Sequence, residues 1–131
     1  MKNSSADGKK ILLLEDEPVI SQMCQRALIS EGFEVDIAIN GEIAQDMLRG
    51  KTYDLCLIDI RTPIMNGEQL YRYMKEKHPE LTNRVIFTTG DVMNGDIQSF
   101  MEQTDRAFLL KPFAPDELIT IIRETLKEIE K

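Results

Sequence analysis

The stretch YDLCLIDIRTPIMNG, residues 53–67, decides the fold of this chain. It contains an apolar run at residues 55–58, which is typical of a short strand buried on both faces of a parallel sheet. Asp59 ends the run, and Pro63 and Gly67 follow in a turn. Ligands bind at the carboxyl ends of strands in an open parallel sheet, so Asp59 is expected at such a site. Its carboxylate is a metal ligand, a nucleophile or a cap of the following turn.

Apolar runs and helical patterns alternate along the rest of the chain. Strands are expected at residues 11–14, 33–39, 55–58, 85–88 and 107–110, with helices around residues 19–28, 43–48, 70–74, 97–101 and 118–129. This alternation predicts an α/β fold, a doubly wound five-stranded parallel sheet with five helices. The second strand alternates apolar and polar residues as an edge strand does, which favours the flavodoxin-like order 2-1-3-4-5.

Length and composition indicate one ordinary domain. The chain has 131 residues, of which residues 1–8 are expected to be a flexible leader and residues 9–131 a single domain. With 16 basic and 23 acidic residues the formal charge is -7, which argues against direct binding to nucleic acid. No apolar run is long enough to span a membrane or to form a signal peptide. Cys24 and Cys56 do not look like a disulfide pair, so a reducing, cytoplasmic setting is expected.

The first strand ends in the acidic run Glu15-Asp16-Glu17-Pro18. Taken alone, this run is typical of a helix start, with Asp16 as the cap. The alternative is a site for Mg2+, which prefers carboxylate and phosphate oxygens together with water. Because Asp16 and Asp59 end neighbouring strands of the predicted sheet, they are placed to share one ion, and Glu15 is placed to reach it through water.

Two further strands end in residues that suit a phosphoryl group. Thr89 follows the fourth strand and is either an ordinary β-branched residue or a hydroxyl directed at a phosphoryl oxygen. Lys111 follows the fifth strand and is either solvated or paired with a carboxylate or phosphoryl group. Two acids, a hydroxyl and an ammonium at four strand ends are what is needed to hold Mg2+ and stabilise a phosphoryl group on Asp59.

Four segments, ILLLEDEP, LIDIRTPIMNG, FTTG and FLLKPF, have the order and spacing seen in one known family. From about residue 9 to 131 the chain resembles the CheY-like receiver domains of two-component response regulators. The resemblance implies that Asp59 accepts a phosphoryl group from a phosphohistidine of a histidine kinase or phosphotransfer protein. The residues that it assigns to the site are Glu15, Asp16, Asp59 and the Arg61 backbone carbonyl for Mg2+, Thr89 and Lys111 for the phosphoryl group, and Thr89 and Phe108 for the switch.

The resemblance also implies how the domain signals. Phosphorylation is expected to shift the face built from the fourth helix, the fifth strand and the last helix, which is also a candidate surface for a homodimer. The domain would be a phosphoacceptor rather than an enzyme. Glu15 and Phe108 stand where the family more often has aspartate and tyrosine, so a switch here lacks the tyrosine hydroxyl. The run FMEQTDRAFLLKPF and the polar start resemble receivers at the ends of hybrid sensor histidine kinases.

Two other classes share parts of this pattern. A magnesium-dependent phosphatase also uses an aspartate after a strand, but a second acid usually follows two residues later, where this chain has Arg61. A flavin carrier needs a phosphate-binding loop after the first strand, where the acidic run would repel the phosphate. We also expect Arg61 and Asp91 to pair across the pocket mouth and hinder the water that removes the phosphoryl group. Two separately solvated side chains are the equally favoured alternative, because exposed pairs are worth only about 0–1 kcal/mol.

Overall fold

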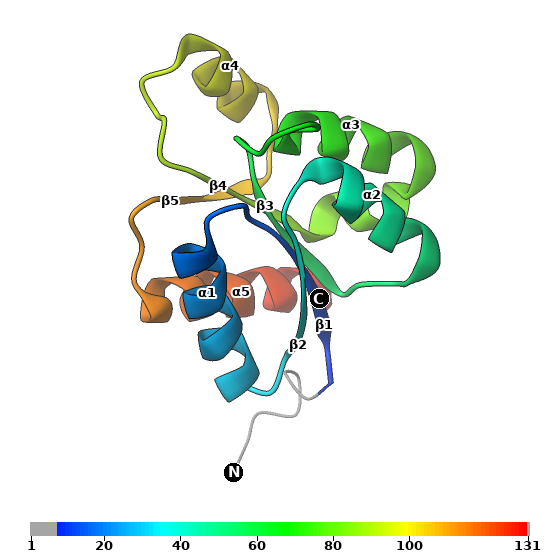
Figure 1. The fold of residues 1–131 in the computed structure, drawn as a ribbon, viewed down its shortest axis with the longest axis vertical. Helices are drawn as coiled ribbons and strands as arrows, with labels where there is room; N and C mark the ends of the chain where they lie inside the picture. The colour runs from blue at the N-terminus through cyan, green and yellow to red at the C-terminus, as the bar shows by residue number, and fades with distance from the viewer. Residues whose placement is uncertain (1–7, 131) are drawn as a thin grey trace.

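Five parallel strands form a single sheet in the order β2-β1-β3-β4-β5, which confirms the predicted topology (Figure 1). The computed structural model describes residues 8–130. The strands are β1 (Lys10–Leu14), β2 (Glu34–Ala38), β3 (Leu55–Asp59), β4 (Val85–Thr89) and β5 (Ala107–Leu110). The helices are α1 (Pro18–Ser30), α2 (Gly41–Gly50), α3 (Gly67–Lys77), α4 (Gly95–Gln103), α5 (Pro115–Glu130) and the 3-10 helix η1 (Pro79–Arg84).

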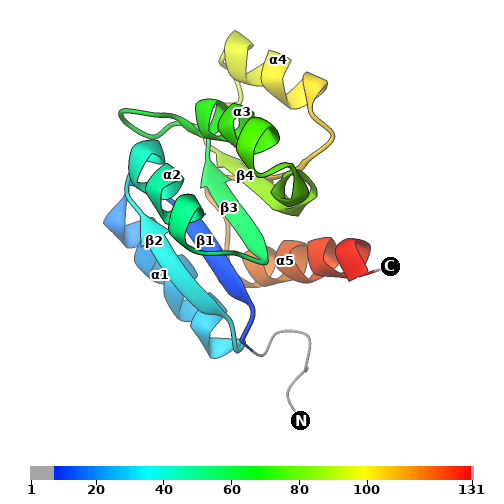
Figure 2. The same ribbon diagram turned by 90° about the vertical axis from the view of Figure 1, so that its right-hand side faces the viewer.

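Helices cover both faces of the sheet (Figure 2). Alternate residues of β1 contribute to the two hydrophobic layers. In β1, Leu12 and Leu14 pack in the layer that contains α2, α3 and α4. Ile11 and Leu13 pack in the layer that contains α1 and α5. All four of these side chains are buried, which explains why residues 11–14 are apolar without a break rather than at every second position.

The strand register brings the carboxyl ends of β3, β4 and β5 to one edge of the sheet. Asp59 is paired with Thr88 across β3 and β4, and Thr89 is paired with Leu110 across β4 and β5. The backbone hydrogen bonding continues one residue further, since the Lys111 N–H donates to the Thr89 carbonyl at 2.9 Å. The last residue of β3 and the residues at the ends of β4 and β5 therefore share one edge.

The N-termini of α3 and α4 are also held close to this edge. Asn66 and Asn94 cap the two helices with side-chain oxygens that accept hydrogen bonds from backbone N–H groups in the first turn. At the start of α3, a Cβ added to Gly67 would lie 2.6 Å from the Asp59 carbonyl oxygen. Only glycine lets α3 begin so close to the end of β3, which keeps the loop after Asp59 short.

Two expectations differ from the structure, and a third lies mostly outside the described residues. Helix η1 is additional to the five predicted helices, because Pro79 ends α3 and begins a 3-10 turn of its own. Asp16 does not cap α1, because Glu17 occupies the cap position and makes no side-chain capping bond. Residues 1–7 of the predicted leader lie outside the described residues, and Gly8 donates a hydrogen bond to the Gly32 carbonyl.

Within residues 8–130, no helix combines the length and the apolar character that a membrane span requires.

Candidate functional site

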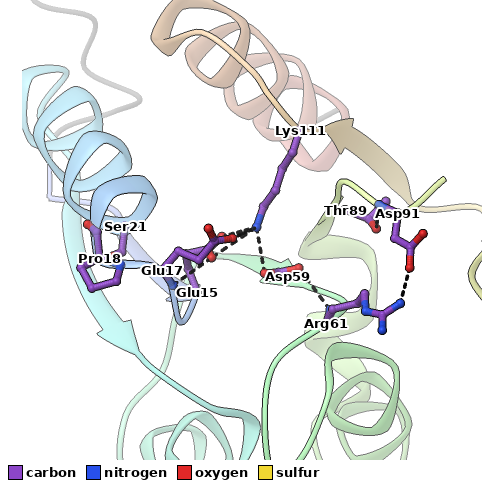
Figure 3. A network of polar contacts seen from close by, with 9 residues as sticks. All are labelled: Glu15, Glu17, Pro18, Ser21, Asp59, Arg61, Thr89, Asp91 and Lys111. Atoms are coloured by element: carbon purple, nitrogen blue, oxygen red, sulfur yellow. Dashed lines mark hydrogen bonds and ion pairs between the residues drawn. The ribbon is translucent and has the colours of Figure 1, made fainter.

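Lys111 lies at the centre of the acidic residues that end the strands (Figure 3). Its Nζ is 2.9 Å from Asp59 Oδ2, 3.0 Å from Glu15 Oε1 and 3.4 Å from Glu17 Oε1. The Lys111 side chain is 13% exposed. The interpretation of this lysine as a solvated side chain is therefore wrong, and the alternative in which it pairs with carboxylates is confirmed.

Burial controls the charges of this cluster. The side chains of Glu15 and Asp59 are only 2% and 4% exposed. Burial raises the pKa of Glu15 to about 7, against the lowering effect of its hydrogen bond from Lys111. Burial likewise raises the pKa of Asp59 above its usual value. Burial disfavours the charge of Lys111, but hydrogen bonds to Asp59 and Glu15 outweigh it and raise the pKa of the lysine. Both buried acids thus ionise less readily than exposed ones, even with the Lys111 ammonium beside them.

The carboxylates of Glu15, Asp16 and Asp59 form a group that suits a hard cation. Each offers one oxygen, and these oxygens all lie within 4.8 Å of one another. Oxygens on opposite sides of an octahedral Mg2+ are about 4 Å apart, so two direct carboxylates with water for the third fit this spacing. The Arg61 N–H donates to Asp59 Oδ1 at 3.1 Å, which places the Arg61 backbone beside the same carboxylate. The donor set therefore fits the expected magnesium site.

Thr89 lies at the end of β4 and is fully buried. Its hydroxyl oxygen accepts a hydrogen bond from the Asp91 N–H at 3.2 Å. Its carbonyl accepts the Lys111 N–H, so the backbones of the predicted hydroxyl and ammonium residues are directly joined. In this conformation the Thr89 hydroxyl oxygen is therefore engaged by a backbone N–H of its own loop.

Phe108 lies on β5 and is half-buried in an aromatic cluster on the α3 and α4 side of the sheet. Its ring is stacked on Phe87, with centroids 5.3 Å apart and planes at 29°. Phe100 of α4 contacts both rings edge to face, with centroids 5.0 Å from Phe87 and 6.3 Å from Phe108. The predicted switch aromatic therefore links β4, β5 and α4.

Arg61 and Asp91 form an ion pair that joins the loops after β3 and β4 (Figure 3). The side chains are 58% and 41% exposed, so the pair lies at the surface. The expected pairing is confirmed, whereas its effect on the phosphoryl group stays a prediction. A cavity of about 570 Å3 opens beside the pair, and its lining includes Asp16, Asn66 and Asn94.

Glu17 also contacts Lys111 in this cluster, but the sequence pattern alone assigns it no role at the site. Its carboxylate contacts Lys111, and its backbone N–H donates to Glu15 Oε2 at 3.2 Å. The only sign of this contact in the sequence is that a third acid follows Glu15 and Asp16, and such an acid is also typical of a helix start.

The sequence profile of the response regulator receiver domain matches residues 11–123 of the chain. The chain belongs to this receiver domain family. Receiver domains are phosphoacceptor switches of two-component phosphorelays rather than classical enzymes, and they interact with histidine kinases or phosphotransfer proteins. The match leaves the phosphatase and flavin-carrier alternatives without support.

Curated relatives resemble this receiver domain over most of its length. It is 36% identical to the probable transcriptional regulator ycf29 of Pyropia yezoensis over 91% of the chain and 56% of the relative. It is 37% identical to response regulator Rre1 of a Synechocystis strain over 92% of the chain and 53% of that relative. The chain thus spans about half the length of these relatives.

Solved structures show the same fold. The receiver domain superimposes with a TM-score of 0.81 on a CheY-like receiver domain protein of Methanospirillum hungatei, at 29% identity and covering 95% of this chain and 98% of that one. It superimposes equally well, with a TM-score of 0.81 at 27% identity, on the receiver domain of a sensor histidine kinase from Pseudomonas aeruginosa. That match covers 92% of this chain and 98% of the other, which has a magnesium ion coordinated in its active site cleft.

Proposed function

We propose that this receiver domain accepts a phosphoryl group on Asp59 from a phosphohistidine of a histidine kinase or a histidine phosphotransfer protein. The observation that carries the proposal is the setting of Asp59. Its buried carboxylate ends β3, receives hydrogen bonds from Lys111 and from the Arg61 N–H, and lies beside two further acids. This arrangement holds the carboxylate in one orientation and concentrates the charge that a cation would neutralise.

Mg2+ would be held by Asp16, Asp59 and the Arg61 backbone carbonyl, with Glu15 acting through water. When bound, the ion supplies positive charge to oxygens of the acceptor and of the phosphoryl group. Burial, and to a smaller extent the charge of Asp59, raises the pKa of Glu15, so added positive charge would help the site to accept a further anion.

In the reaction, a carboxylate oxygen of Asp59 attacks the phosphorus atom, and the bond from phosphorus to the histidine nitrogen breaks. The electron pair of that bond stays on the imidazole, which takes up a proton. Lys111 and the Thr89 hydroxyl then donate hydrogen bonds to the phosphoryl oxygens, which is the charge stabilisation that phosphoryl transfer requires. Water later attacks the phosphorus, the bond from phosphorus to the Asp59 oxygen breaks, and inorganic phosphate leaves while the Asp59 carboxylate is restored.

The signal would leave the site through Thr89 and Phe108. When the Thr89 hydroxyl turns toward the phosphoryl group, it gives up the hydrogen bond from the Asp91 N–H. The space and backbone around Phe108 then change, and with them its contacts to Phe87 and Phe100. Such a change biases the α4-β5-α5 face between two states, and the same face is our candidate for a homodimer. The domain would comprise residues 9–131, whether free-standing or part of a hybrid sensor kinase.

Intact mass spectrometry tests the proposal directly. After incubation with acetyl phosphate and Mg2+, the protein should gain the mass of one phosphoryl group. The gain should disappear in Asp59→Asn and after chelation, and it should persist in the control Asp105→Asn, whose side chain is 97% exposed. No adduct under any condition, or an adduct that survives Asp59→Asn, would overturn the proposal.

A further inference from the structure

Three carboxylates share the Lys111 ammonium, and one of them differs from the other two. Glu15 and Asp59 are almost fully buried and lie 3.0 and 2.9 Å from Nζ. Glu17 is 62% exposed, and its oxygen is 3.4 Å from Nζ, which makes it the longest of the three contacts (Figure 3). Glu17 is therefore the partner that Lys111 can release at the smallest cost.

An ammonium has three N–H donors, and the three carboxylates occupy all of them. A phosphoryl group on Asp59 inherits the donor that Asp59 itself uses. A second hydrogen bond from Lys111 to the phosphoryl oxygens requires Glu15 or Glu17 to give way. Glu15 is poorly placed to do so, because it is buried and the Glu17 N–H also holds it. The Glu17 side chain can move into water, and it borders a cavity of about 400 Å3 with Ile20 and Phe113 that gives it room.

We propose that Glu17 is a positioning residue for Lys111. Its carboxylate holds the ammonium in the unphosphorylated form and competes with the phosphoryl group for it, so that Glu17 lowers the affinity of the site for the phosphorylated state. This inference rests on the proposed function of Asp59 as the acceptor. The backbone N–H of Glu17, which orients Glu15, is not changed by a side-chain substitution, so the two roles of this residue are separable.

Beryllofluoride with Mg2+ is the probe, because it occupies a phosphoryl site without a chemical step. The full chain is titrated and followed by NMR in the wild type, in Glu17→Gln and in the control Glu34→Gln, which removes the same charge from an exposed position at the start of β2. Glu17→Gln should bind about two- to fivefold more tightly, the range expected for an exposed charge pair. Glu34→Gln should bind like the wild type.

A Lys111→Met background separates competition for the ammonium from a general electrostatic effect. If Glu17 acts through Lys111, Glu17→Gln has no measurable effect in that background. If the gain persists there, Glu17 acts on the probe through its charge alone, and the proposal is wrong. Equal affinities of the wild type and Glu17→Gln would also refute it.

A second measurement needs neither phosphorylation nor the probe. The 15N signal of the Lys111 ammonium should report greater mobility in Glu17→Gln than in the wild type, and unchanged mobility would contradict the positioning role. A failed inference remains distinguishable from a failed function. If the wild type forms the Asp59 adduct while Glu17→Gln behaves identically in both assays, only the role of Glu17 is lost.

Discussion

Replacing Glu15 by glutamine should stabilise the metal-free protein at pH 8. Glu15 is 2% exposed, and burial raises its pKa from 4.5 to about 7. At pH 8 the carboxylate is ionised in both the folded and the unfolded state, and the folded state bears the cost of burying the charge. Glutamine removes this cost. Lys111 keeps Asp59 and Glu17 as partners, so the substitution does not leave a buried ammonium without a counter-charge.

The size of the effect follows from the two pKa values. Each tenfold difference in proton affinity corresponds to about 1.4 kcal/mol, so the rise corresponds to about 3 kcal/mol of lost stability above pH 7. The buried glutamine amide must find hydrogen-bond partners of its own, which reduces the expected gain to about 1–3 kcal/mol. Below pH 4.5 the carboxyl group is protonated in both states. The stabilisation should therefore vanish there and grow as the pH rises toward 7.

Urea unfolding in the presence of a chelator, at pH 4.5 and pH 8, measures this difference. At pH 8 the midpoint of Glu15→Gln should lie about 1 M above that of the wild type, for a slope of about 2 kcal/mol per molar urea. The control Glu34→Gln should change stability by less than about 0.5 kcal/mol at either pH. Adding Mg2+ should stabilise the wild type more than Glu15→Gln, because a cation offsets the charge that the variant lacks.

Two results would refute this reasoning. Equal stabilisation at pH 4.5 and pH 8 would show that the ionisation of Glu15 is not the cause. A loss of stability at pH 8 would show that the hydrogen bonds between Glu15 and Lys111 outweigh the cost of burial, so that the pKa of Glu15 lies below its ordinary value rather than above it.

Three further changes test the backbone and the pocket mouth. Gly67→Ala should lower the free energy of unfolding by about 1–3 kcal/mol in the same urea assay, because its Cβ would meet backbone atoms within 3 Å. In the control Gly95→Ala, at the start of α4, the added Cβ meets nothing within 4 Å, so the stability should stay within about 0.5 kcal/mol of the wild type. Ile64→Gly should raise stability by about 1 kcal/mol in thermal unfolding, because a β-branched residue is strained at φ 70°. Arg61→Ala should speed loss of the phosphoryl group by up to about fivefold, measured by mass spectrometry. The control Arg72→Ala, which breaks another surface pair, should leave the rate unchanged. An unchanged rate in Arg61→Ala would show that the ion pair does not hinder water.

The sequence predicts the sheet well because its signals are local. The unbroken apolar runs in β1 and β3 indicate central strands, and the alternation in β2 indicates an edge strand, each within a few residues. The 3-10 helix at Pro79–Arg84 is too short to show a helical period, so it was missed. Residues such as Asp59 and Lys111 could be placed together because one ends and the other directly follows a strand of the same parallel sheet, whose carboxyl ends share one edge.

Contacts that depend on side-chain conformation could not be predicted in the same way. Glu17 reaches Lys111 across 94 positions of sequence, so their contact depends on the tertiary structure. The stacking of Phe108 on Phe87 follows from the register of β4 and β5, which pairs these two residues, but how far the ring is buried depends on α4. The sequence therefore indicated where the site lies but not how its charges are shared.

Because several carboxylates share one ammonium, we expect the binding of the metal and the stability of a phosphoryl group on Asp59 to depend on each other. In the structure four carboxylates, of Glu15, Asp16, Glu17 and Asp59, gather around or beside one ammonium. A phosphoryl group on Asp59 adds negative charge to a site where burial already disfavours it. Lys111 can turn toward the new group only by leaving other carboxylates with less compensation. Under the proposed function, a cation would take over the acids that Lys111 leaves, and we therefore expect the phosphorylated form to depend on the metal because one ammonium is shared among these acids.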